Sequence, residues 1–129
     1  MAGEAVLVVD DNPVNTKLMC FLLLKCGYQV RSALSAEQAL DILRTFTPRL
    51  ILMDLQLAGV DGFELTRQLK AAPATRDIVV VAVTANAMKG DEERAREAGC
   101  DGYVTKPIDT RALPARLASY LSGTQPEAL

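Results

Sequence analysis

Five polar residues stand at the ends of apolar runs in the sequence, and their types suit phosphoryl chemistry. They are Asp10, Asp11, Asp54, Thr84 and Lys106. Clustered carboxylates repel one another unless a cation joins them, and magnesium or manganese suits a set of carboxylate oxygens. A lysine and a hydroxyl nearby could neutralise the oxygens of a phosphoryl group, and an aspartate could accept that group as a nucleophile. This chemistry requires a fold that brings these distant positions to one place.

The composition excludes several other chemistries. The chain has no histidine, so it holds no Ser-His-Asp triad, no histidine metal ligand and no phosphohistidine of its own. Its three cysteines, Cys20, Cys26 and Cys100, form no CxxC pair, which argues against a disulfide framework or a zinc site. We expect them to be buried or half-buried thiols in a reducing compartment. The P-loop pattern GxxxxGK is also missing from the sequence.

Length and charge point to one domain that binds neither nucleic acid nor membrane. The chain has 129 residues, of which 50% are hydrophobic, and a net charge of −2. We expect a single domain over 1–129, with a core at about 5–121 and a short polar tail at 122–129. No basic excess favours nucleic acid, and no apolar run or signal peptide favours a membrane, so a cytoplasmic location is expected.

Apolar runs alternate with helical patterns along the whole chain. Strands are predicted at 5–9, 28–33, 50–53, 78–83 and 102–105, and helices at about 13–26, 35–46, 61–71, 87–98 and from 109 onward. This alternation is typical of an α/β fold with a parallel sheet. Ligands of such sheets bind outside the carboxyl ends of the strands, where the five polar residues stand. We therefore expect these residues to converge on one cleft.

Local signals mark the ends of several helices. Asn12 can cap the first helix, Pro13 suits its first position, and Gly27 suits its end. Four apolar residues of this helix are predicted to share one face: Val14, Leu18, Phe21 and Leu22. Ser35 with Gln38 resembles a capping box for the second helix. Asp61 can cap the third, and Asp109 stands near the start of the last, with Pro114 expected in its first turn.

Four stretches of the sequence resemble the signature stretches of the response-regulator receiver domain. They read VVDDNPVN, LILMDLQLAGVDGFEL, VVAVTANAM and DGYVTKPI, and the resemblance covers about residues 5–121. The chain is most similar to short single-domain regulators of the DivK and CheY type, and also to receivers attached to hybrid kinases. The resemblance implies a flavodoxin-like (CheY-like) doubly wound fold, with five parallel strands in the order 2-1-3-4-5 and five helices.

The same resemblance implies a signalling switch of a two-component system or phosphorelay rather than an enzyme. Asp54 would be the phosphoacceptor, and its donor a phosphohistidine on a histidine kinase or a histidine phosphotransfer protein. Asp11, Asp54 and the backbone carbonyl of Gln56 would bind Mg²⁺ (or Mn²⁺) directly. Asp10 would act through water and through Lys106.

The remaining implied roles concern the switch and its output. Lys106 would pair with the acceptor carboxylate and then with the phosphoryl group, to which Thr84 would also move. Tyr103 would swing inward when Thr84 leaves its resting place, although an aromatic residue in a short strand is also common as plain core packing. A downstream protein would bind the face made by the fourth helix, the fifth strand and the fifth helix.

Other interpretations stay open at this point. Each polar residue taken alone could be a cap, a turn residue or a surface charge. The chain could be a binding module that never uses phosphate, although the complete polar set argues against this. It could be a phosphatase with an aspartyl-phosphate intermediate, although such enzymes use DxD on the first strand and this chain reads Asp10-Asp11-Asn12. Its short start and tail favour a complete protein over a domain of a hybrid kinase, while the kinase and the target are left unspecified.

Overall fold

The computed structural model describes residues 4–55, 62–84, 89–105 and 108–121, within which five strands alternate with five helices. The strands are β1 (Ala5–Val9), β2 (Gln29–Ala33), β3 (Leu50–Asp54), β4 (Val79–Thr84) and β5 (Gly102–Thr105). The helices are α1 (Pro13–Lys25), α2 (Ala36–Ile42), α3 (Gly62–Ala71), α4 (Lys89–Ala98) and α5 (Leu113–Leu121). All strand pairs are parallel, in the order β2-β1-β3-β4-β5. The predicted α/β fold and strand order are confirmed.

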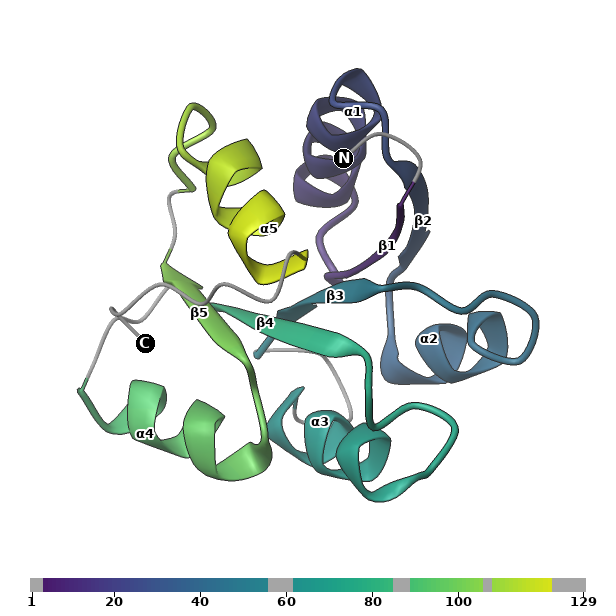
Figure 1. Cartoon of the computed structure of the whole chain (residues 1–129), viewed down its shortest axis with the longest axis vertical. Helices are drawn as coiled ribbons and strands as arrows, with labels where there is room; N and C mark the ends of the chain where they lie inside the picture. Colours follow the sequence, from purple (N-terminus) through teal and green to yellow (C-terminus); the bar gives the residue numbers. More distant parts are fainter. Residues whose placement is uncertain (1–3, 56–61, 85–88, 106–107, 122–129) are drawn as a thin grey trace.

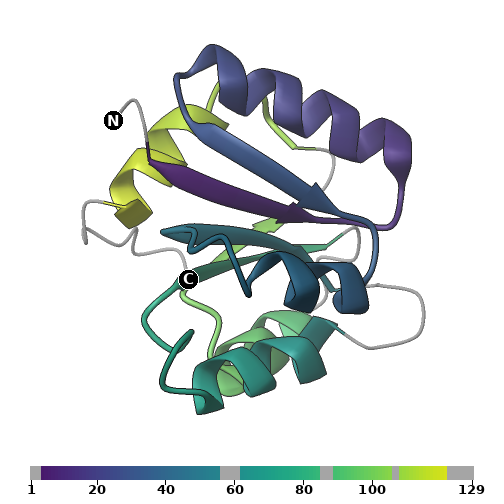
Figure 2. The ribbon, with the colours of Figure 1, turned by 90° about the vertical axis from the view of Figure 1, so that its right-hand side faces the viewer.

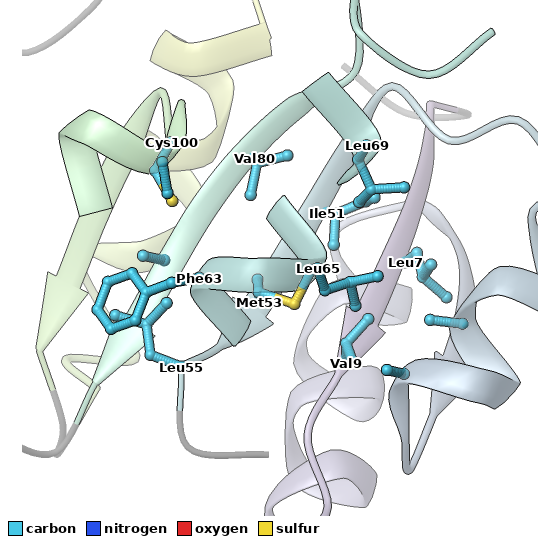
Figure 3. Packing of buried hydrophobic residues seen from close by; sticks show 14 of the residues in the cluster. Leu7, Val9, Ile51, Met53, Leu55, Phe63, Leu65, Leu69, Val80 and Cys100 are labelled. Carbon is cyan, nitrogen blue, oxygen red and sulfur yellow. The ribbon is translucent and has the colours of Figure 1, made fainter. Parts of the chain in front are cut away.

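Helices cover both faces of the sheet (Figures 1 and 2). Helices α1 and α5 pack on one face, and α2, α3 and α4 pack on the other. Because successive strand residues point to opposite faces, each strand contributes to both cores. In β3, for example, Ile51 and Met53 join the core under α2 to α4, part of which Figure 3 shows, while Leu50 and Leu52 join the core under α1 and α5. Within the described residues no helix is long and apolar enough to cross a membrane.

The strand register aligns the carboxyl ends of the three central strands. Val9 of β1 pairs with Met53 of β3, so the following residue, Asp10, is level with Asp54. Asp54 pairs in turn with Val83 of β4, which directly precedes Thr84. The apolar pairing of the strands therefore brings the polar residues that follow them to one edge of the sheet.

Helix α1 begins and ends as its sequence signals predict. The Asn12 side chain accepts hydrogen bonds from the backbone N–H groups of Val14 (2.9 Å) and Asn15 (3.2 Å), and Pro13 is the first helical residue. Gly27 follows the helix with a φ of 92°, a left-handed conformation that glycine adopts without a steric penalty.

The side of α1 that faces the core differs from our prediction. Of the four apolar residues predicted to share a face, three are exposed: Val14 (75%), Leu18 (54%) and Phe21 (59%). The residues that pack on the sheet are Thr16, Met19 and Leu23. The apolar pattern was ambiguous because residues 18–24 are apolar without interruption, so α1 has an apolar stripe on both sides.

Helix α2 is shorter than predicted. The predicted pair of Ser35 and Gln38 does mark its start, since the Gln38 N–H donates to Ser35 Oγ at 3.1 Å and the Leu34 N–H donates to Gln38 Oε1 at 2.7 Å. The helix ends at Ile42 rather than near Phe46. Beyond Ile42 the chain tightens into turns with hydrogen bonds three residues back, a common way to end a helix.

Helix α5 begins later than predicted, at Leu113 instead of near Asp109. The Asp109 side chain accepts hydrogen bonds from the N–H groups of Arg111 (3.0 Å) and Ala112 (3.3 Å), so it caps the turn that precedes the helix. Pro114 is then the second residue of α5, where a missing N–H breaks no helical bond. Asp61, the loop predicted at 55–60 beyond Leu55, and residues 85–88 lie outside the described residues.

Strand β5 and helix α5 approach most closely at Gly102. A Cβ atom at this position would lie 2.4 Å from Cζ and 2.7 Å from the hydroxyl oxygen of Tyr120. The Tyr120 ring is buried in the core under α5 and has little room to move. Glycine is therefore required here by packing, although its φ is not positive.

We predict that Gly102→Ala destabilises the protein by about 1–3 kcal/mol, because the added methyl group overpacks a filled core. Urea unfolding followed by circular dichroism measures the change. Thr105→Ala, at the exposed end of the same strand, serves as the control and is expected to stay within about 0.5 kcal/mol of the parent chain. Equal stability of both variants would contradict the packing argument.

Candidate functional site

Three carboxylates gather at the carboxyl ends of β1 and β3. Asp10, Asp11 and Asp54 each place one carboxylate oxygen within 4.8 Å of the others. Asp54 is 4% exposed and Asp10 is 8% exposed, whereas Asp11 is exposed to solvent. The sequence predicted this convergence, and the structure places two of its three carboxylates in a partly dehydrated setting where a cation would be held most strongly.

Backbone and hydroxyl donors fix the segment that carries the acidic pair. The Asp10 N–H donates to Ala33 O at 3.1 Å, and Asp10 Oδ1 accepts from the Asn12 N–H at 2.9 Å. The buried Thr16 hydroxyl of α1 lies 3.1 Å from Asp10 O and 2.9 Å from Asn12 O, and it donates to these carbonyls. The turn between β1 and α1 is thus held from β2 on one side and from α1 on the other.

A cavity of about 550 Å³ opens beside Asp10 and Asp54. Its walls are formed by residues of α1, by the carboxyl ends of β1, β3 and β4, and by the residues before α5. The other lining residues are Val8, Val9, Asn15, Leu18, Met19, Leu22, Leu52, Val83, Ile108 and Thr110. The cavity is therefore mostly apolar, with two carboxylates at one end.

Thr84 and Tyr103 lie on the opposite face of the sheet from Asp54. Strand alternation places Thr84 on the same side as Ala82, which belongs to the core under α2 to α4. Tyr103 is half-buried against that same core, and its strand partner in β4 is Ala82. Thr84 and Tyr103 thus share a face on neighbouring strands, one step apart along the sheet.

Two predicted site residues cannot be placed in this arrangement. Gln56, predicted to offer its backbone carbonyl to the metal, and Lys106, predicted to pair with Asp54, lie outside the described residues. Each directly follows the described part of the site: Leu55 comes after β3, and Thr105 is the last residue of β5.

The thiols offer no competing nucleophile at this edge of the sheet. Cys100 is buried, and burial raises its pKa to about 11, so it stays protonated at neutral pH. Burial also raises the pKa of the half-buried Cys20. Cys26 is exposed, contrary to our expectation, because it caps the outer end of α1. None of the three lines the cavity beside the aspartates.

The aspartate set suits a hard divalent cation. Three carboxylates offer oxygen ligands alone, without the nitrogen or sulfur that zinc or copper prefers. Magnesium is usually held by one or two carboxylates and keeps several waters, which the exposed position of Asp11 permits. The residues present therefore fit Mg²⁺.

Comparison with known proteins decides the family. The model of the response regulator receiver domain matches residues 6–118, which is most of the chain. The chain belongs to this family. Its members are signalling switches that accept phosphoryl groups from kinases, bind Mg²⁺ in an acidic site and act on downstream targets.

Relatives of this receiver support the assignment over nearly its whole length. The polar-differentiation response regulator DivK of Brucella ovis is 46% identical over 118 residues, 92% of this chain and 96% of the relative. DivK of Brucella anthropi is 45% identical over the same shares.

Solved structures agree with the fold and the site. The receiver domain of sensor histidine kinase PA1611 from Pseudomonas aeruginosa is 34% identical, with a TM-score of 0.85 over 94% of this chain and 99% of that one. That structure has a magnesium ion coordinated in its active site cleft. A putative response regulator from Chloroflexus aurantiacus is 28% identical, with a TM-score of 0.88 over 93% of this chain and 98% of that one.

Sequence reasoning missed Thr16. A threonine in the first turns of a helix usually bonds the carbonyl four residues back, as Thr16 does with Asn12. Its second acceptor, Asp10 O, lies six residues back and outside the helix. The signal that could have revealed this contact is a threonine in the first turns of the helix that follows the acidic pair.

We predict that Thr16→Val loosens the acidic turn. Valine keeps the shape of threonine but removes the donor to Asp10 O, so the free energy of unfolding should fall by about 1 kcal/mol. Hydrogen exchange of the Asn12 amide, which bonds Asp10 Oδ1, should become faster than in the parent chain. Thr16→Ser keeps the hydroxyl and serves as the matched control; unchanged exchange in Thr16→Val would contradict the role of the hydroxyl.

Proposed function

We propose that this receiver accepts a phosphoryl group on Asp54, from a phosphohistidine of a histidine kinase or a histidine phosphotransfer protein. The observation that carries the proposal is the buried position of Asp54 at the end of the central strand, within 4.8 Å of two further carboxylates. One oxygen of Asp54 attacks phosphorus while the bond to the imidazole nitrogen breaks, and the electron pair of that bond stays on the imidazole.

The other aspartates divide the task of holding Mg²⁺. Asp11, which is exposed, and Asp54 would bind the ion directly, with the backbone carbonyl of Gln56 as a further ligand. Asp10 is tied to the Asn12 N–H, which favours a supporting role through water. The bound ion would neutralise the oxygens of the phosphoryl group. Lys106, which follows the end of β5, would add a positive charge beside the same oxygens.

Acetyl phosphate with Mg²⁺ tests the acceptor directly. The parent chain should gain one alkali- and hydroxylamine-labile phosphoryl group, visible by intact-protein mass spectrometry, and Asp54→Asn should gain none. Asp41→Asn, at an exposed aspartate of α2, is the matched control and should label like the parent chain. Asp11→Asn should slow labelling by about 10–100-fold, because one metal ligand is lost. Equal labelling of the parent chain and Asp54→Asn would overturn the proposal.

Helix α1 offers a docking surface for the protein that donates the phosphoryl group. Helix α1 lies on the outside of the molecule in Figure 2. Its outward stripe, which consists of Val14, Leu18 and Phe21, is exposed. Leu18 also lines the cavity that reaches Asp10 and Asp54. A contiguous apolar stripe on the outer side of a helix is typical of a surface that a partner protein covers. We therefore assign this stripe to the donor, whose histidine must reach Asp54 from the adjoining cavity.

We predict that Phe21→Ala slows phosphoryl transfer from a donor protein but not from the small molecule acetyl phosphate. Loss of the ring should slow transfer from a phosphorylated donor protein by about tenfold, because a buried aromatic anchor is worth at least 1–2 kcal/mol at an interface. Labelling by acetyl phosphate should not change, since the ring lies on the outside of α1. Leu40→Ala, at an exposed leucine of α2 on the other face, is the control. Equal slowing with both donors would show that Phe21 supports the fold and not the docking.

The switch that follows phosphorylation would run through Thr84 and Tyr103. Thr84 would bond the phosphoryl group, and the half-buried Tyr103 ring, on the same face one strand away, would turn inward into the space that Thr84 leaves. The surface formed by α4, β5 and α5 would then change and select a downstream protein.

A further inference from the structure

Arg116 of α5 makes a polar contact with the backbone of β5. Its Nη2 donates a hydrogen bond to the carbonyl oxygen of Tyr103 at 3.0 Å. The guanidinium keeps its charge at all accessible pH values, so this bond is charge-assisted and stronger than an ordinary backbone bond. Apolar contacts also join α5 to the sheet.

The acceptor belongs to an edge strand. Strand β5 is the last strand of the sheet and pairs only with β4, so one side of its backbone is not used by the sheet. Proteins cover such edges in several ways, and a guanidinium is one of them. The need to cover the edge explains a positive charge near β5. It does not explain why the carbonyl of Tyr103, rather than another carbonyl of the strand, is the acceptor.

The burial of Arg116 indicates a more specific role. Its Nε is buried and has no hydrogen-bond partner among the residues that the structure describes. Burying the Nε–H donor without a partner costs free energy. The bond from Nη2 to one carbonyl therefore indicates that the position of the guanidinium itself matters. An arginine needed only for solubility would extend into solvent, as the exposed Arg111 does.

The position of the acceptor connects this geometry to the switch. Tyr103 directs its ring to the core under α2 to α4, whereas Arg116 reaches its carbonyl from α5. Fixing a carbonyl fixes the peptide plane and restricts the direction of the adjoining side chain. The bond therefore favours the observed half-buried ring over any arrangement that needs a different backbone at Tyr103.

We propose that Arg116 is a positioning residue for the switch: its guanidinium holds the Tyr103 peptide and so couples the ring of Tyr103 to helix α5. This inference rests on the proposed function, in which the ring leaves its half-buried position after phosphorylation. Loss of this bond should lower the free energy needed to move the Tyr103 ring inward. It also frees α5 from the movement of β5.

Beryllium fluoride with saturating Mg²⁺, a stable substitute for the phosphoryl group, tests the coupling. Its saturation midpoint is followed by the amide NMR signals of β5 and α5. We expect Arg116→Ala to lower the midpoint by about fivefold, the low end of measured coupling between sites. Arg111→Ala removes the same charge just before α5, from an exposed side chain, and should leave the midpoint unchanged.

A double-variant cycle separates coupling from mere edge covering. In a Tyr103→Ala background the ring is absent, so adding Arg116→Ala should no longer change the midpoint. An unchanged midpoint in Arg116→Ala, or a fivefold shift that persists without the ring, would overturn the inference. If Arg116→Ala does not fold, Arg116→Lys keeps the charge but not the fixed fork of donors, and it should shift the midpoint in the same direction.

The same titration tests the role of Arg116 separately from the proposed role of Asp54 as acceptor. If the parent chain and Asp54→Asn respond to beryllium fluoride alike, the proposed acceptor is wrong. If only the parent chain responds but Arg116 variants titrate like it, the acceptor stands and the role of Arg116 is wrong.

Discussion

The mutual repulsion of three carboxylates is the constraint around which the site is built. Asp10, Asp11 and Asp54 are far apart in an unfolded chain, and folding brings their oxygens within 4.8 Å. Two of the three lose most of their contact with water, which strengthens the repulsion. The aspartates cannot hold themselves together, so their separation is set by the apolar pairing of β1 with β3 and by the donors that fix the turn after β1. The unfavourable charge that the core enforces is what gives a divalent cation its affinity.

In the proposed function, the two faces of the sheet separate the residue that would accept the phosphoryl group from the residues that would respond to it. Asp54 and the cavity beside it lie on the side of α1 and α5, while Thr84 and Tyr103 lie on the side of α3 and α4. Because strand residues alternate between faces, a residue at the end of β3 and one at the end of β4 can act on the same group and still touch different cores. A phosphoryl group on Asp54, as proposed, would lie at this sheet edge, where it could influence both cores.

The sequence predicted an element correctly where its pattern of residues had a single physical explanation. Continuous apolar runs predicted strands such as β1, β3 and β4 within a residue or so, because only a sheet covered on both faces buries such runs. Their polar ends predicted the cluster of aspartates for the same reason. The buried side of α1 was predicted wrongly, since residues 18–24 are apolar on both sides and burial depends on the rest of the fold. Helix α5 was placed too early because Asp109 caps a turn with the same side-chain bonds that cap a helix.

Contacts between distant backbone and side-chain atoms had no sequence signal. Nothing in the spacing of Tyr103 and Arg116 predicts that a side chain of α5 bonds a carbonyl of β5, because the turn between them decides which residues meet. The same holds for Gly102 and Tyr120, which pack at the neighbouring position of the strand. The bond of Arg116 uses a carbonyl of an edge strand, whereas Gly102 meets Tyr120 on the face of the sheet under α5.

In the proposed function, the residues just before α5 would connect the acceptor site with the output surface. Ile108 and Thr110, which precede α5, line the cavity beside Asp54, and Arg116 of α5 bonds the backbone of Tyr103. A donor that entered this cavity, as proposed, would therefore contact the residues that lead into α5. The contacts that join α5 to β5 include the charged bond from Arg116 to Tyr103 O and the close packing of Tyr120 against Gly102. A small change at Tyr103 would then alter the proposed output surface without any rearrangement of the central strands, whose buried packing holds the aspartates in place.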